Sequence, residues 1–221
     1  MKVLITGGSG LLGSYLNNEL SKTNEILSVY YRNSENSNRY NSQQIDIMDE
    51  EKLHTLFNSF RPAIVIHTAA MTNPILSPDI DPKAIYIVNV NSTKKIAELC
   101  NKYSAKLIYT SSDLVYAGYR GSMLNEESKL IPVSLYAETK LMGEIKIQET
   151  FDNYLNLRIA LLYGFGLGKK KNHFEEMYNN LKAGNTVKLF HDQYRTPLSL
   201  TEAARIINEL CNKNIKSEVI N

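Results

Sequence analysis

Short apolar runs alternate with amphipathic stretches over the first three quarters of the chain. Each apolar run is bounded by glycine or polar residues, which is typical of buried parallel strands. We expect strands at 2–6, 25–31, 63–70, 106–112 and 154–164. Apolar side chains between them recur at helical spacing, and helices are expected over 10–22, 49–60, 83–103 and 134–151. The alternation predicts βαβ units and therefore an α/β fold, a doubly wound parallel sheet covered on both faces.

The pattern changes after residue 164, where fewer elements are expected. These are a helix near 172–183, a short strand at 186–190, a helix near 200–212 and a strand in the last six residues, 216–221. We interpret residues 1–164 as one domain and residues 165–221 as a small, shortened C-terminal lobe interleaved with the sheet. Truncation and natural shortness both remain open as reasons for the short lobe.

Composition excludes several classes of protein. A formal net charge of +2 gives no strong field toward nucleic acid or a membrane surface. No apolar stretch is long enough to span a bilayer and no secretory signal is present, so we expect a cytoplasmic protein. Cys100 and Cys211 are far apart, and no Cys/His pairing indicates a metal site. The run Lys169–Lys171 fits a solvated loop or a phosphate contact.

The stretch "TGGSGLLG" at 6–13 joins the first expected strand to the first expected helix. Gly7 permits a tight turn, Gly10 lets a pyrophosphate approach the backbone, and Gly13 lets the helix pack closely on the sheet. The phosphates would then lie at a helix N-terminus, where free N–H groups point outward. An ordinary glycine-rich turn is the alternative. The cofactor-binding candidates here are Gly7, Ser9, Gly10, Leu11, Leu12 and Gly13.

The end of the second expected strand bears on the choice of cofactor. Arg32 stands there without a neighbouring acid until Glu35, and an arginine can accommodate the extra phosphate of NADP. We therefore favour NADP(H) over NAD(H), with an ordinary surface arginine as the alternative. After a polar stretch, 33–44, expected to be a mobile loop, Asp46 could accept a hydrogen bond from the adenine amine while Ile47 packs on the ring. Asp46 could equally cap the next helix.

Tyr136 and Lys140 lie four residues apart and therefore share one face of their expected helix. A nearby lysine favours the phenolate, so the pair predicts a proton donor tuned toward neutral pH. Ser112 ends the fourth expected strand, at the edge where α/β proteins bind ligands, and could orient a substrate oxygen. A chance pair on a solvent-facing helix is the alternative. The three candidates predict proton transfer to a carbonyl oxygen as a nicotinamide supplies hydride.

Together these motifs resemble the extended short-chain dehydrogenase/reductase family, in its branch of dTDP-4-dehydrorhamnose reductases and related sugar-nucleotide enzymes. The matching pieces occur in family order: "TGGSGLLG", "DI" at 46–47, "HTAA" at 67–70, "NVNSTKKIAELC" at 89–100, "TSSDLVYAG", "YAETKLMGE" and "LRIALLYG". The resemblance implies a Rossmann fold with NAD(P) and a triad of Ser112, Tyr136 and Lys140. It also implies that Ala69 and Ala70 line the cofactor groove.

Two residues carry the resemblance to the reductase branch further. The 4,6-dehydratases place an Asp-Glu pair after the Ser/Thr, whereas Asp113 is followed here by Leu114, which cannot take a proton. Arg195, in "RTP", matches a region that borders the substrate pocket and could face a diphosphate, with a surface salt bridge as the alternative. Asp113 and Arg195 are therefore the substrate candidates.

The resulting hypothesis is an NAD(P)H-dependent reductase of a keto group on a nucleotide-activated sugar. One alternative is an NAD-dependent sugar-nucleotide epimerase. Another is a non-catalytic NAD(P)-binding regulatory subunit of the same fold, such as the β subunit of methionine adenosyltransferase. The expected partner is a nucleotide-sugar substrate, and the resemblance implies a possible homodimer through the helices at 83–103 and 134–151.

Overall fold

A computed structural model describes residues 1–72, 81–118, 121, 123–168 and 172–221. The lysine run at 169–171 and most of the stretch between the third strand and the next helix lie outside the described residues. None of the described helices is long and apolar enough to cross a membrane.

Seven parallel strands form the central sheet, in the order β3-β2-β1-β4-β5-β6-β9. Their bounds are Ser42–Gln44 for β3, Glu25–Tyr30 for β2, Lys2–Thr6 for β1, Ile64–His67 for β4, Lys106–Ser112 for β5, Tyr154–Ile159 for β6 and Glu218–Ile220 for β9. The central strands are almost entirely buried, because helices cover both faces of the sheet. The predicted doubly wound parallel sheet is confirmed.

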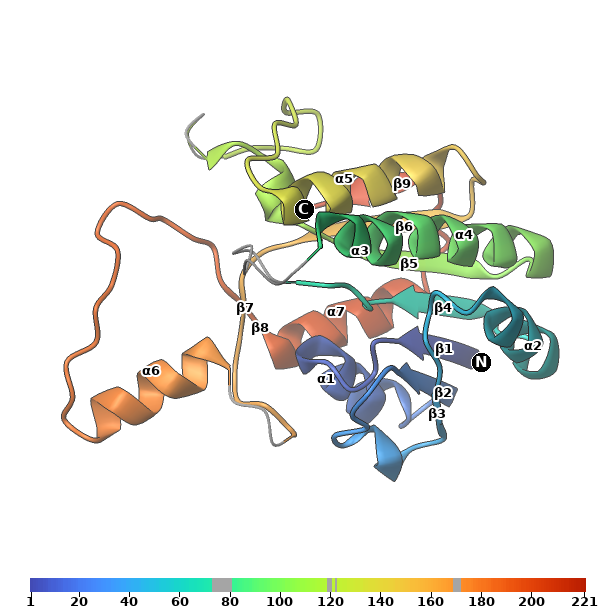
Figure 1. Ribbon diagram of the computed structural model, residues 1–221, viewed down its shortest axis with the longest axis horizontal. Coiled ribbons are helices and arrows are strands. Elements are labelled where there is room, and N and C mark those ends of the chain that lie inside the picture. Colours follow the sequence, from blue (N-terminus) through green and yellow to red (C-terminus); the bar gives the residue numbers. More distant parts are fainter. Residues whose placement is uncertain (73–80, 119–120, 122, 169–171) are drawn as a thin grey trace.

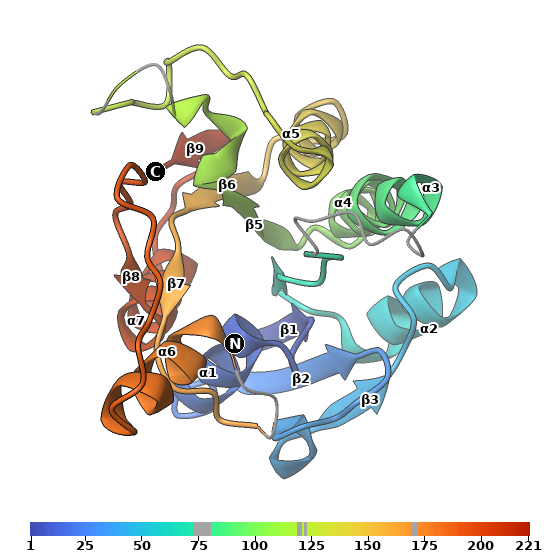
Figure 2. The same ribbon diagram turned by 60° about the vertical axis from the view of Figure 1, so that its left-hand side comes forward.

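Figures 1 and 2 together show the helices in two layers, one on each side of the sheet. The helices of one layer are α1, Leu11–Leu20, and α7, Leu200–Cys211; those of the other are α2, Glu50–Phe60, α4, Ser92–Tyr103, and α5, Leu135–Gln148. Each layer encloses its own apolar cluster, one containing Leu16 and Ile207 and the other Phe57 and Ile96. Burial of these clusters is the main free-energy gain that holds helices to sheet.

Two expectations need correction in this part of the chain. The polar stretch 33–44 is not wholly a loop, because its last residues form strand β3 beside β2. The helix expected at 83–103 consists of three pieces: α3, Pro82–Tyr86, a π-helical turn, η2, Ile87–Asn91, and α4. A π turn inserts an extra residue into a helix and often marks a functional position.

The chain after 164 leaves the sheet and then returns to it. Strand β7, Leu162–Tyr163, pairs with β8, Leu198–Ser199, and between them lies α6, His173–Lys182, which stands away from the sheet in Figure 1. The stretch 186–190, expected to be a strand, has no regular structure because no neighbouring strand pairs with it. Helix α7 and strand β9 then rejoin the body, and Lys106 Nζ donates to the carbonyls of Leu210 and Lys213 at the end of α7.

Candidate active site

The carboxyl ends of β1, β4 and β5 lie side by side at one edge of the sheet. Thr6 is paired in register with His67, and His67 with Tyr109. The segments that follow these strands therefore meet at this edge, in the place where ligands bind in open α/β sheets. They carry the glycine turn, the residues after His67, and Ser112.

The glycine turn is tightly folded. Gly7 has a φ of 72°, in the left-handed region, and a Cβ at this position would lie 2.7 Å from the backbone nitrogen of Ala69. Gly10 N–H donates to the Gly7 carbonyl over 2.9 Å, and a Cβ at Gly13 would overlap that same carbonyl. The turn thus brings the first helix and the Ala69 backbone close together, and glycine is required at Gly7 and Gly13 for this approach.

Helix α1 begins without a capping side chain, since Gly10 is its N-cap residue. Its first N–H groups therefore remain available to an anion at the positive end of the helix dipole. Ser9 and Leu11 are partly exposed, whereas Leu12 is buried in the core. The Leu12 side chain belongs to the apolar cluster between α1 and the sheet, and Leu11 packs against that cluster, so the Leu12 backbone alone could contact a phosphate.

Sequence analysis missed the role of a fourth glycine in this turn. A Cβ at Gly8 would overlap the Oγ of Ser28 on β2, and the Gly8 carbonyl accepts a hydrogen bond from Asn17 Nδ2 at 3.0 Å. The turn therefore lies directly against β2 because Gly8 has no side chain. The spacing of the other three glycines contains no signal for this contact.

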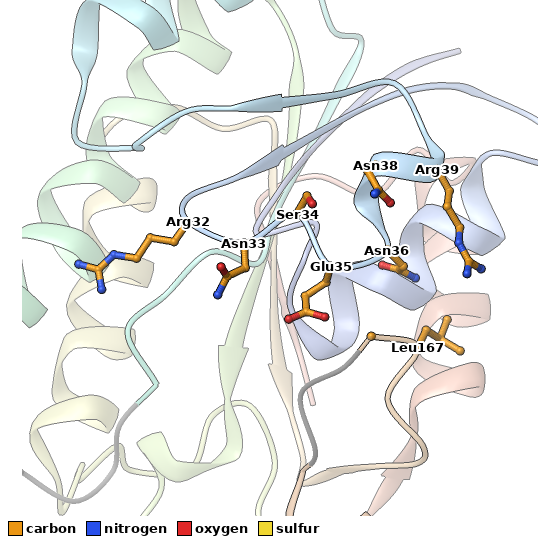
Figure 3. Close-up of a pocket in the computed structure, with 9 residues that line it drawn as sticks. Arg32, Asn33, Ser34, Glu35, Asn36, Asn38, Arg39 and Leu167 are labelled. Carbon is orange, nitrogen blue, oxygen red and sulfur yellow. The ribbon is translucent and has the colours of Figure 1, made fainter.

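An open pocket of about 680 Å³ lies beyond the end of β2 (Figure 3). It is lined by Arg32, Asn33, Ser34, Glu35, Asn36, Asn38, Arg39, Leu167 and Gly168. The guanidinium groups of Arg32 and Arg39 point away from one another in Figure 3, and the Glu35 carboxylate lies between them. The structure thus places Arg32 at the expected end of β2, and it adds Arg39 and Glu35, which the sequence gave no reason to combine.

Asp46 and Ile47 follow β3, near this pocket in the chain. Asp46 Oδ1 accepts a hydrogen bond from Met48 N–H at 2.9 Å, whereas Asp49 caps α2 by accepting from Lys52 N–H at 3.0 Å. The alternative of Asp46 as the helix cap is therefore wrong. Ile47 is 7% exposed, so only a small part of this residue could contact an adenine ring.

Ser112 is the last residue of β5 and is followed by a short 3-10 turn, η3, Asp113–Val115. Ser112 Oγ accepts from Leu114 N–H at 3.2 Å and donates to Asp113 Oδ1 at 3.3 Å. Arg195 Nη1 lies 3.8 Å from Asp113 Oδ2 in a partly exposed ion pair. Burial raises the pKa of Asp113, and Arg195 opposes that rise. The two substrate candidates, Asp113 and Arg195, therefore lie together next to Ser112. Arg195 forms the salt bridge that was its alternative role, and its partner is Asp113.

Tyr136 and Lys140 lie in the first two turns of α5, which begins after the N-cap Ser134. Burial and the Asp113 carboxylate raise the pKa of Tyr136 to about 12. Burial lowers the pKa of Lys140 to about 7, against the opposing effect of Glu144. We expected Lys140 to lower the pKa of Tyr136 toward neutral pH. The protein groups raise that pKa instead, so this expectation is wrong. Desolvation dominates both side chains.

Beneath α5 lies a buried polar layer that includes Lys140, Tyr109, His67, Glu144 and Arg158. The Lys140 ammonium is 4.0 Å from the centre of the Tyr109 ring, and that ring stacks on His67 at 5.5 Å. Burial lowers the pKa of His67 to about 3, so the imidazole is neutral near pH 7. Arg158 Nη2 lies 2.9 Å from Glu144 Oε2 in a fully buried ion pair.

The buried ion pair between Arg158 and Glu144 also links helix α5 to the segment that follows Ser112. Arg158 Nη1 donates to the Tyr116 hydroxyl at 2.6 Å and to the Glu126 carbonyl at 3.1 Å. Glu144 belongs to the helix of Tyr136, whereas Tyr116 follows Ser112 in the chain. Sequence analysis missed this link, although the spacing of four between Lys140 and Glu144 was a usable signal of a shared helix face.

The π turn η2 positions Asn89 between α5 and the residues that follow β4. Asn89 Oδ1 accepts from Met71 N–H at 2.8 Å, and its Nδ2 donates to the Met71 carbonyl at 3.1 Å and to Thr139 Oγ1 at 3.0 Å. Asn89 thus fixes the backbone of Met71, the residue that directly follows the partly exposed Ala69 and Ala70. Among the described residues, no group of three or more His, Cys, Asp or Glu side chains is arranged to hold a metal ion.

The chain matches known proteins over its whole length. A family model described as the RmlD substrate binding domain matches residues 1–221. The methionine adenosyltransferase 2 subunit beta of Rattus norvegicus is 30% identical over 97% of this chain, and the chain spans 63% of the length of that relative. A probable low-salt glycan biosynthesis reductase, Agl14, of Haloferax volcanii is 28% identical over 97% of this chain and 72% of its own length.

Several solved structures superpose on this chain over almost its whole length. A hypothetical dTDP-4-dehydrorhamnose reductase from Sulfolobus tokodaii superposes with a TM-score of 0.86 at 28% identity, covering 100% of this chain and 75% of its own. The dTDP-4-dehydrorhamnose reductase of Bacillus anthracis in complex with NADP gives 0.78 at 26% identity, covering 96% and 71%. The Bordetella bronchiseptica enzyme WbmG in complex with NAD gives 0.82 at 26% identity, covering 99% and 71%.

Proposed function

Because the chain belongs to the RmlD substrate binding domain family, we propose that it is an NAD(P)H-dependent reductase of a keto group on a nucleotide-activated sugar. Two contacts carry the proposal. Asp113, which accepts a hydrogen bond from Ser112, lies close enough to Tyr136 to raise the pKa of its phenol. Lys140, one helical turn after Tyr136, is buried. Solved relatives that carry NADP or NAD support the cofactor class.

The residues present fit a dinucleotide. Gly7, Gly10 and Gly13 leave the backbone open at the start of α1, where no side chain occupies the first N–H groups. Ala69 and Ala70 would border the nicotinamide half, and Arg32 would face the adenosine ribose, for which we propose NADP(H) over NAD(H). When bound, the nicotinamide supplies hydride to the keto carbon.

The protein groups then handle the proton. Tyr136 would donate its phenolic proton to the carbonyl oxygen, and Ser112 would orient that oxygen with its hydroxyl. A charged Lys140 would stabilise the phenolate that remains. Asp113 disfavours a negative charge on Tyr136, so it favours the phenol before the transfer. We assign residues 1–164 to cofactor binding and residues 165–221 to the sugar nucleotide, with Arg195 near its diphosphate.

One further function is favoured by a specific observation. The matched methionine adenosyltransferase subunits support a non-catalytic, NAD(P)-binding regulatory subunit as the second candidate. In either case we propose a homodimer through α3, α4 and α5, because Tyr86 and Ile87 leave about two fifths of their surfaces exposed on that side.

Two measurements test the proposal. NADPH and NADH are titrated against the purified chain by nicotinamide fluorescence, and cofactor oxidation is then followed at 340 nm with dTDP-4-keto sugars. The reductase predicts binding and turnover, and Tyr136→Phe should lose about 10²-fold or more in rate while keeping cofactor affinity. Binding without turnover, with Tyr136→Phe indistinguishable in every assay, would support the regulatory subunit. Absence of cofactor binding would contradict both.

A further inference from the structure

Lys140 lies over the face of an aromatic ring that no motif predicted. Lys140 is 2% exposed, and Tyr109 on β5 is fully buried. The distance of 4.0 Å from Nζ to the ring centre is well within the range of a cation–π interaction. Such an interaction is strongest where water is excluded, as it is here.

The position of the Tyr109 ring is fixed from several sides. His67 stacks on it at an interplanar angle of 29°, and His67 is itself hydrogen-bonded to Thr6 at 2.6 Å and to Thr93 at 2.9 Å. The Tyr109 hydroxyl reaches the Lys140 carbonyl at 3.5 Å.

Helix α5 leaves room for the Tyr109 phenol. A Cβ at Gly143 would overlap the Tyr109 hydroxyl. The helix therefore has a glycine in its interior, where glycine costs about 1 kcal/mol relative to alanine. The gap that this glycine provides is occupied by the end of the tyrosine side chain.

Few charged groups face the lysine. On its own helix, Glu144 favours the charged form, and its carboxylate is shared with Arg158 of β6. His67 of β4 is neutral near pH 7, and the pKa values of Tyr109 on β5 and of Tyr136 are raised, so both phenols are neutral as well. Burial opposes the charge on Lys140. The face of the Tyr109 ring and the carboxylate of Glu144 are thus the two described groups that favour the ammonium.

We infer that Tyr109 is a positioning residue for the proposed reduction: the negative face of its ring stabilises the charged form of Lys140 and holds the ammonium in place. This inference rests on the proposed function for its role in the reaction. The interaction itself belongs to the protein groups and can be measured without substrate or nicotinamide.

The test measures the charge of Lys140 directly. The chain is produced with ¹³Cε-labelled lysine, the Lys140 signal is assigned by its absence in Lys140→Arg, and its titration is followed by NMR. Tyr109→Leu removes the ring face and should raise the acid dissociation constant of Lys140 about tenfold or more. Tyr109→Phe keeps the face and should change that constant less than threefold. Equal titration of the wild type and Tyr109→Leu would overturn the inference.

A second series covers the case in which Tyr109→Leu does not fold. Phenylalanines with increasing fluorine substitution are incorporated at position 109, because fluorine weakens the negative ring face with little change in size. The acid dissociation constant of Lys140 should rise steadily along the series, and a constant value would overturn the inference.

The catalytic readout is the alkaline limb of the pH profile. A lysine that deprotonates more readily loses its charge at lower pH, so the fall of kcat/KM in Tyr109→Leu should begin about one pH unit earlier than in the wild type. Tyr109→Phe should keep the wild-type profile. If no turnover is found but the NMR titration shifts, the proposed reduction fails and the interaction stands; if the titration is unchanged, the inference fails whatever the turnover.

Discussion

Helices α5 and α6 both begin at a residue whose side chain caps the helix, yet they differ in how much of each helix is buried. Ser134 caps α5 by accepting from Ala137 N–H, and Asn172 caps α6 in a full capping box with Glu175. Helix α5 buries six residues, including Lys140 and Glu144, whereas α6 buries none. Signals within a helix therefore set where it begins, but only the surface against which it packs can desolvate its side chains and change their chemistry.

Helix α6 is held by contacts between aromatic rings rather than by burial against the sheet. Phe174 packs against Tyr163 and Phe165 with ring centres 5.6 and 5.4 Å apart, and Phe165 packs against Tyr178 at 5.1 Å. Farther along the chain, Phe190 is 75% exposed. The groups assigned to proton transfer thus lie on buried, closely packed elements, while the groups assigned to sugar binding lie on a segment held by partly exposed rings.

The largest contrast is expected between two arginines. Arg158→Leu leaves the Glu144 carboxylate buried without its partner and should lower the free energy of unfolding by about 3–5 kcal/mol. Arg195→Leu removes a partly exposed ion pair at 3.8 Å and should cost less than about 1 kcal/mol. Denaturant unfolding of both variants measures the difference. Equal losses would show that burial does not distinguish the two regions.

The next contrast concerns pH. The pKa of Lys140 in the folded chain, about 7, lies below its ordinary value of 10.5, so the folded state holds fewer protons than the unfolded state between these values. The unfavourable contribution of this lysine is absent above pH 10.5, grows as the pH falls, and is complete below about pH 7. The free energy of unfolding of Lys140→Met should therefore rise relative to that of the wild type as the pH falls. We expect this difference to grow by about 3 kcal/mol from pH 10 to pH 6.5.

Lys146 provides the matched control on the same helix. It is paired with Glu149 at 2.7 Å on the outer side, and the stability difference between Lys146→Met and wild type should stay nearly constant over this range, because water screens an exposed ion pair. Urea unfolding at the two pH values measures both variants. A flat difference for Lys140→Met would contradict the assigned desolvation.

The smallest effect is expected in α6. Phe57 is fully buried between α2 and the sheet, and Phe57→Ala should cost about 3–5 kcal/mol. Phe174→Ala should cost less than about 1 kcal/mol globally, because its ring partners are partly exposed, and should raise hydrogen exchange in α6 alone. A global loss as large as that of Phe57→Ala would place α6 within the cooperative core.

Much of the fold was predictable because buried parallel strands appear as continuous apolar runs. The sheet, its covering helices and the family resemblance are confirmed. Strand β3 escaped prediction because Ser42–Gln44 is polar and depends on pairing with β2. The strand expected at 186–190 failed for the opposite reason: a suitable local sequence has no neighbouring strand there.

The candidate site was less predictable than the fold. Spacing identified Tyr136 and Lys140, since i and i+4 share a helix face. It could not identify Tyr109 or Arg158, which lie on other elements and meet α5 only after folding. It also gave the wrong direction for the pKa of Tyr136, because burial and the Asp113 carboxylate are consequences of packing.

The pairing of β7 with β8 has a consequence for how such a chain can diverge. The segment between Tyr163 and Leu198 leaves and rejoins the body at neighbouring strands, which lie about 5 Å apart in any sheet. A closed loop of this kind can double in length for only about 0.6 kcal/mol of added closure entropy. Insertion, deletion or wholesale exchange between these two points leaves the register of the seven-stranded sheet untouched. Under the proposed function, the segment assigned to the sugar nucleotide can therefore change in length and sequence without moving the strands and helix that hold Ser112, Tyr136 and Lys140.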